Sequence, residues 1–93
     1  MKNNKINIIR KKLDKLDLKM LSIIKRRSLL VNKILKQKEF KNQIIDNKRI
    51  RIILKKITKE SQKRNLDSKI TNTIWKAMIR SFINYEFRNF KKK

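Results

Sequence analysis

The sequence predicts an all-α fold in which three helices are joined by short turns. The chain contains no glycine and no proline, the two residues that most strongly punctuate local structure. Its large aliphatic residues recur at spacings of three, four or seven, which is typical of one face of an α-helix. A chain of 93 residues is also expected to form a single domain, here spanning residues 1–93.

A first, very long helix is expected from about residue 5 to about residue 38. Its apolar stripe consists of Ile6, Ile9, Leu13, Leu16, Met20, Ile23, Leu30 and Ile34. Such a helix would be roughly 50 Å long, whereas a compact chain of this size is only about 30 Å across. Because the remaining residues are too few to cover the stripe, either the helix kinks or a second copy of the chain covers the overhang, and we favour a homodimer.

A second helix is expected over residues 46–63, after a connection at residues 39–45. Asp46 or Asn47 can accept hydrogen bonds from the unpaired backbone N–H groups at its start. Asn65 follows the helix and is a suitable left-handed terminator in a chain that lacks glycine.

A third helix is expected over residues 67–90, with Asp67 as its cap. Its i, i+4 row is formed by Ile70, Ile74, Met78, Phe82 and Glu86. The row is apolar except for its last member, Glu86, which places an ionisable group on the apolar face of this helix.

The chain is strongly basic, with 29 lysine and arginine residues, 7 acidic residues and a net charge of +22. This balance suits an anionic partner such as nucleic acid, an anionic membrane or a small anionic substrate. A genome rich in A and T would also favour lysine codons. The positions of particular cations are therefore more informative than their number.

Cysteine and histidine are both absent, which excludes disulfides, thiolate chemistry and the commonest metal ligand and general base. The acidic residues are scattered, so neither a metal nor a cofactor is expected. An enzyme of this composition would act by positioning and electrostatics. The sequence has neither a run of about 20 apolar residues nor a signal-peptide core, so we expect a cytoplasmic location and no membrane association.

All three helices place an ionisable side chain on the apolar face. Arg27 and Lys38 lie eleven residues apart along the first stripe, about three turns, and project from nearly the same side. Arg49 and Glu86 interrupt the apolar rows of the second and third helices. A single such cation often extends its head group into water along an apolar surface. Three cations and a carboxyl group together predict a cavity for an anion with more than one negative group, because buried charges need partners.

The order of these residues resembles that of the all-helical chorismate mutases, a family that also includes isochorismate-pyruvate lyases. The resemblance covers residues 6–90. "IIDNKR" (44–49) resembles the approach to that family's second helix, and "NLDSKITNTIWKAMI" (65–79) resembles the start of its third. In the first helix it is carried by Arg10, Leu13, Leu16, Asp17, Leu21, Arg27 and Lys38 at the family's spacing.

The resemblance implies an intertwined dimer with two equivalent sites that convert chorismate to prephenate, a step of the shikimate pathway to the aromatic amino acids. Arg10 is expected to reach into the partner's site and bind a substrate carboxylate. Helical geometry agrees, because Arg10 and Arg27 lie about 100° apart around the helix and need not serve one pocket within one chain.

The resemblance also implies a role for each of the other site residues. Arg27 is expected to bind a carboxylate, and Lys38 to donate to the ether oxygen and to a carboxylate. Arg49 should lie near the bound ligand, and Asp46 near the substrate hydroxyl. Glu86 stands at the position that hydrogen-bonds the ether oxygen, where glutamine is common.

This chemistry suits a site without histidine, because the rearrangement breaks a C–O bond and forms a C–C bond in one pericyclic step. The protein must hold a dicarboxylate in its compact reactive conformer and stabilise negative charge developing on the ether oxygen. Guanidinium groups suit the carboxylates because their fork is bidentate, and an ammonium group suits a single oxygen.

Three positions depart from the mutase pattern. Ile50 stands where the mutases usually have a glutamate that contacts the ring hydroxyl; an apolar residue there is similar to the isochorismate-pyruvate lyases, which are the alternative function. Phe82 stands where a small polar residue often helps to bind a carboxylate. Glu86 can donate a hydrogen bond only when protonated, so activity is expected to rise toward acid pH.

A basic helical nucleic-acid-binding protein is an alternative from another class. Phosphate contacts would explain the net charge simply. They would not explain cations on the apolar stripes, and the sequence has no zinc pattern, glycine-containing turn or aromatic platform. No nucleic-acid partner is therefore expected.

Overall fold

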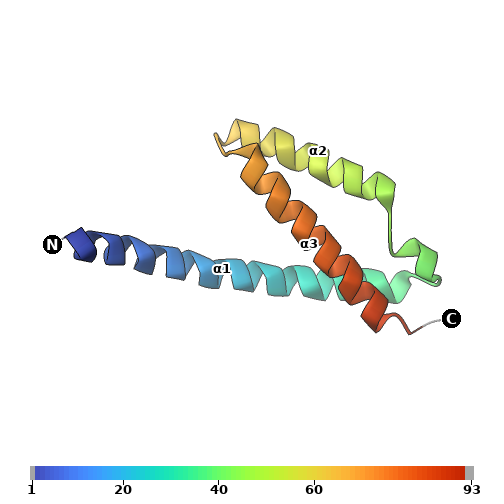
Figure 1. Cartoon of the computed structure of the whole chain (residues 1–93). Helices are drawn as coiled ribbons and strands as arrows, with labels where there is room; N and C mark the ends of the chain where they lie inside the picture. Colours follow the sequence, from blue (N-terminus) through green and yellow to red (C-terminus); the bar gives the residue numbers. More distant parts are fainter. Residues whose placement is uncertain (1, 92–93) are drawn as a thin grey trace. The chain divides into compact units, whose positions relative to one another are not determined.

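The fold comes from a computed structural model that describes residues 2–91, with side chains from residue 4 onward. Within these residues the protein is all-α and has no strand. Figure 1 shows its elements in chain order: α1 (Lys2–Gln37), the short 3-10 helix η1 (Lys41–Gln43), α2 (Asn47–Lys63) and α3 (Ser68–Asn89). The prediction of three α-helices with a very long first one is confirmed.

Helix α1 runs for 36 residues without interruption, as expected where neither glycine nor proline breaks the pattern. It ends at Gln37, one residue before the expected end. Lys38 is therefore the first residue of the connection, although its backbone N–H still donates to the carbonyl of Leu35 at 3.1 Å. This last turn fixes the point from which the Lys38 side chain leaves the helix.

The chain divides into two compact units, Met1–Val31 (the N-terminal unit) and Asn32–Lys93 (the C-terminal unit). The described part of the N-terminal unit is a single helical segment of α1. Every large aliphatic side chain of its stripe is exposed. Leu16, for example, keeps 53% of its surface in solvent. A lone helix has no second element against which to bury an apolar stripe.

Local hydrogen bonds explain the ends of α2 and α3. The Asp46 side chain accepts from the backbone N–H of Arg49 at 3.0 Å and caps α2, as predicted. Asn65 takes a positive φ of 55° after α2, which confirms its role as a left-handed terminator. The Asp67 side chain then accepts from the backbone N–H of Lys69 at 2.9 Å and caps α3.

Helices α2 and α3 are joined by two hydrogen bonds between side chains. The hydroxyl oxygens of Ser61 and Thr71 lie 2.7 Å apart, and the Thr58 hydroxyl donates to the Asn72 side-chain oxygen at 3.1 Å. Ser61 also donates to the carbonyl of Ile57 at 2.7 Å, so its buried hydroxyl is satisfied. These bonds set how α2 lies along α3.

The buried apolar core is small over the described residues. Leu35 and Ile44 are its buried members, with 8% and 3% of their surfaces exposed. Twenty large hydrophobic side chains are exposed, which is far more apolar surface than a monomeric soluble protein usually presents. None of the described helices combines the length and the apolar character needed to cross a membrane.

Candidate active site

Lys38 and Glu86, two of the predicted site residues, meet in the C-terminal unit. Lys38 follows the last turn of α1 and Glu86 lies in α3, yet Lys38 Nζ is 2.8 Å from Glu86 Oε1. The Lys38 side chain is 18% exposed and that of Glu86 is 8% exposed. A charge withdrawn from water this far is costly unless it is paired, and each group supplies the partner that the other needs.

The Lys38 ammonium group has a second acceptor in the same unit. Its Nζ lies 3.5 Å from the carbonyl oxygen of Ile44, the most deeply buried apolar residue described. An ammonium group carries three N–H donors. Contacts to Glu86 and Ile44 account for two of them, so Lys38 has the capacity to donate to one further oxygen without breaking either contact.

Gln43, which is not among the site residues predicted from the sequence, organises the connection that carries Ile44. Its side-chain oxygen accepts from the backbone N–H groups of Glu39 at 2.7 Å and Phe40 at 2.9 Å. The signal that could have found it is a glutamine three residues after the start of a turn, where its side chain reaches back to unpaired N–H groups. Gln43 therefore supports the loop on which the Ile44 carbonyl is presented to Lys38.

Three predicted site residues lie at the start of α2. Asp46 is exposed and caps the helix through its bond to the backbone of Arg49. The Arg49 side chain is exposed, whereas Ile50 is half-buried. Asp46 has the capping role that the sequence predicts. The contact with a substrate hydroxyl that the family resemblance implies stays a prediction.

Phe82 lies on α3 one turn before Glu86 and is half-buried. Residues four apart in a helix are neighbours on one face, so the Phe82 ring and the Glu86 carboxylate share a face of α3. An apolar ring beside a carboxylate reduces the access of water to it.

The other two predicted site residues, Arg10 and Arg27, belong to the N-terminal unit. Arg10 is exposed along α1. Arg27 is half-buried, and its Nε has essentially no exposed surface and no hydrogen-bond partner among the described residues. A guanidinium N–H withdrawn from water without an acceptor is costly. The Nε–H group of Arg27 therefore needs a hydrogen-bond acceptor, and a carboxylate would be a suitable one.

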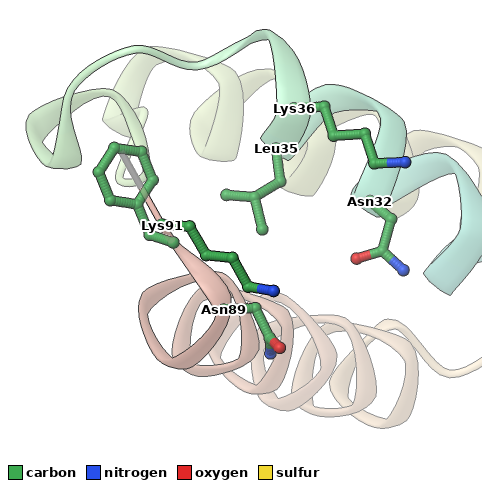
Figure 2. A pocket seen from close by; sticks show the side chains of 6 residues that line it. Asn32, Leu35, Lys36, Asn89 and Lys91 are labelled. Carbon is green, nitrogen blue, oxygen red and sulfur yellow. The ribbon is translucent and has the colours of Figure 1, made fainter. Parts of the chain in front are cut away.

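A cavity of about 250 Å³ opens between the last turn of α1 and the C-terminal end of α3. Figure 2 shows Asn32, Leu35 and Lys36 extending from α1, with Asn89 and Lys91 at the end of α3. Its lining consists of Asn32, Leu35, Lys36, Asn89, Phe90 and Lys91. None of the predicted site residues lines this cavity, so it is separate from the predicted site.

The fold and the paired charges place the chain among small all-α proteins with ionised groups withdrawn from solvent. The sequence model of one family, described as chorismate mutase type II, matches residues 9–87. The chain therefore belongs to the chorismate mutase type II family, and its function is of the chorismate mutase type. No curated protein and no solved structure shows a significant match. The matched segment contains every predicted site residue, from Arg10 to Glu86.

Proposed function

We propose that this protein is an enzyme that rearranges chorismate to prephenate, with no cofactor and no metal. The family match over residues 9–87 carries the proposal. The shielded Lys38–Glu86 pair supports it, because it holds a cation and a potential donor together away from solvent. The family also supports a cytoplasmic role in aromatic amino acid biosynthesis.

The proposed site binds the two carboxylates of chorismate by guanidinium groups. Arg27 takes one of them, which would satisfy the Nε that has no partner among the described residues. Arg10 takes a carboxylate in the site of a second copy. With both carboxylates held, the substrate is confined to its compact reactive conformer, and the entropy of reaching that geometry is lost on binding rather than in the chemical step.

Lys38 is proposed to stabilise the negative charge that develops on the ether oxygen as the C–O bond breaks. Its remaining donor capacity, beyond the contacts to Glu86 and Ile44, allows this without unpairing Glu86. A fixed cation in a site of low water content stabilises such charge far better than it does in bulk water. Glu86, when protonated, would donate to the same oxygen.

The exposed stripe of α1 supports a homodimer as the active form. A helix of 36 residues whose aliphatic side chains remain about half exposed needs a second apolar surface. A two-fold dimer would bring the same stripe from both copies together, and it would carry Arg10 of each copy to the other's site. The dimer would cover the exposed apolar surface. It would also let Arg10 and Lys38, which lie far apart along the sequence, serve the same site.

Ile50 favours a second candidate function, that of an isochorismate-pyruvate lyase. It is half-buried in the first turn of α2, next to Arg49, and offers no hydrogen-bonding side chain. A site with an apolar wall at this point does not recognise a ring hydroxyl there. The lyase would bind the isomer whose hydroxyl lies elsewhere on the ring, with the same cations.

The test is to offer chorismate and isochorismate separately to the purified protein and to follow each with its products. Prephenate from chorismate supports the mutase; pyruvate and salicylate from isochorismate, without prephenate, would make the lyase the primary activity. The Lys38→Ala variant, checked for helicity by circular dichroism, should lower either activity at least about 100-fold. A protein that converts neither compound but binds nucleic acid with a steep salt dependence would overturn both enzyme proposals.

A further inference from the structure

A hydrogen bond between Tyr85 and Asn32 joins α1 to α3 within the C-terminal unit. The Tyr85 hydroxyl donates to the side-chain oxygen of Asn32 at 2.8 Å. Tyr85 directly precedes Glu86 in α3, and Asn32 lies six residues before Lys38 in α1. Figure 2 shows Asn32 extending from α1 on the side where α3 lies.

The surroundings of Asn32 make this bond a fixed point of the fold. Leu35, three residues further along α1, is one of the two buried apolar residues of the described chain. Residues three apart are neighbours on a helix surface, so Asn32 and Leu35 share the same side of the helix. Tyr85 is half-buried, and a hydrogen bond away from bulk water is weakened less by competing solvent.

Lys38 benefits from such a fixed point because the spacing between its charge and Glu86 depends on how α3 lies against the end of α1. Lys38 lies just beyond the last residue of α1, and its side chain has four carbons between the backbone and the charge. Its hydrogen bond to Glu86 joins the residue that follows α1 to α3, and the Tyr85–Asn32 bond joins α1 itself to α3. When a substrate oxygen takes the remaining donor of the Lys38 ammonium group, the Tyr85–Asn32 bond is left in place, because it involves no charged group and no substrate atom.

We propose that Tyr85 and Asn32 are positioning residues that hold α3 against the end of α1, so that Lys38 and Glu86 keep their spacing while substrate is bound. This inference rests on the proposed mutase activity for its kinetic consequence. Neither residue needs to touch the substrate. Loss of the bond should therefore lower kcat, which depends on the placement of the charges, more than it raises KM.

The test uses Tyr85→Phe, which removes only the hydroxyl group, and Asn32→Ala. Each should lower kcat with chorismate about fivefold, the usual worth of one hydrogen bond, while KM changes less than about twofold. The double variant should be no slower than the slower single one, because both changes remove the same bond. Thr73→Ala is the matched control: it removes an exposed hydroxyl that bonds the carbonyl of Lys69 within α3, and it should leave kcat unchanged.

A second readout does not depend on activity. In the unmodified protein the Lys38 ammonium protons should exchange slowly with water in side-chain NMR spectra, with the signal assigned by its loss in Lys38→Arg. Tyr85→Phe should accelerate that exchange, and Thr73→Ala should not. If the unmodified protein rearranges chorismate but Tyr85→Phe changes neither kcat nor the exchange, the positioning role is wrong and the enzyme proposal stands. If the unmodified protein has no activity, the enzyme proposal fails, and the exchange rate alone supports or overturns the positioning role.

Discussion

The ammonium group of Lys38 lies 2.8 Å from a carboxylate oxygen of Glu86, although the two residues are 48 positions apart in the sequence. The pair is the most shielded of the ion pairs described, since the others are exposed contacts of Glu60 within the C-terminal part of α2 and the turn after it. A pair that is held out of water has a large effect on local chemistry.

Lys38→Ala should lower kcat/KM for chorismate by about 10²- to 10³-fold, the usual effect of removing one donor that stabilises developing negative charge. The comparison variant is Lys41→Ala, which removes an exposed cation from η1. Steady-state kinetics at one ionic strength should show a change of less than about twofold for Lys41→Ala. Equal losses in the two variants would mean that general attraction of the anion, rather than Lys38, sets the rate.

Glu86→Gln should raise kcat/KM for chorismate at neutral pH. An ionised carboxylate cannot donate to the ether oxygen, whereas an amide can. The measurement is the steady-state kinetics of both proteins in the same neutral buffer. An unchanged or lower kcat/KM in Glu86→Gln would falsify the donor role proposed for this position.

A mixture of two inactive variants should regain activity if Arg10 serves the site of the partner chain. In a heterodimer of Arg10→Ala and Lys38→Ala, one site lacks both groups and the other contains both. Random reassociation makes half of the dimers mixed, so about one quarter of the original activity should return. The variants are unfolded together in denaturant, refolded and assayed, with each variant alone as the control. No recovery, when native mass spectrometry shows heterodimers, would place Arg10 outside the partner's site.

Leu16→Asp should prevent the proposed dimer from forming, because it places a charge on the stripe that we propose a second copy covers. Leu18→Asp is the matched control. Leu18 is 66% exposed and lies two residues away, about 200° around the helix from Leu16. Sedimentation equilibrium should show monomers for Leu16→Asp and dimers for Leu18→Asp. The melting temperature of Leu16→Asp should also lose its dependence on protein concentration. Two variants with the same association state would rule out the stripe as the interface.

Sequence reasoning found the elements of this fold because their causes are local. A glycine-free chain with aliphatic residues at helical spacing forms helices. Asp46 and Asp67 cap the starts of α2 and α3 by accepting from backbone N–H groups within three residues, and Asn65 ends α2 through its positive φ angle. Helix α1 ends at Gln37, one residue before the expected end, and the Lys38 backbone N–H closes its last turn by donating to the carbonyl of Leu35.

The candidate site was predictable in part. Lys38 and Glu86 were visible as ionisable groups on apolar rows, since a stripe interrupted by charge is unusual whatever it packs against. Their partnership was not visible, and neither was the support from Gln43 or the bond between Tyr85 and Asn32. Those contacts join residues that are close only after the chain folds. Nothing in their spacing distinguishes them from other polar pairs.

The sequence by itself determined that this chain is helical, where two of its helices are capped, and which family it belongs to, because helical periodicity, capping and motif spacing are all properties of neighbouring residues. The tertiary structure decided which charges meet, that Ile44 presents its carbonyl to Lys38, and that Leu35 and Ile44 form the buried core. The physical reason is that a paired charge or a buried side chain is stable only through partners far along the chain, and the three-dimensional packing of the helices selects those partners.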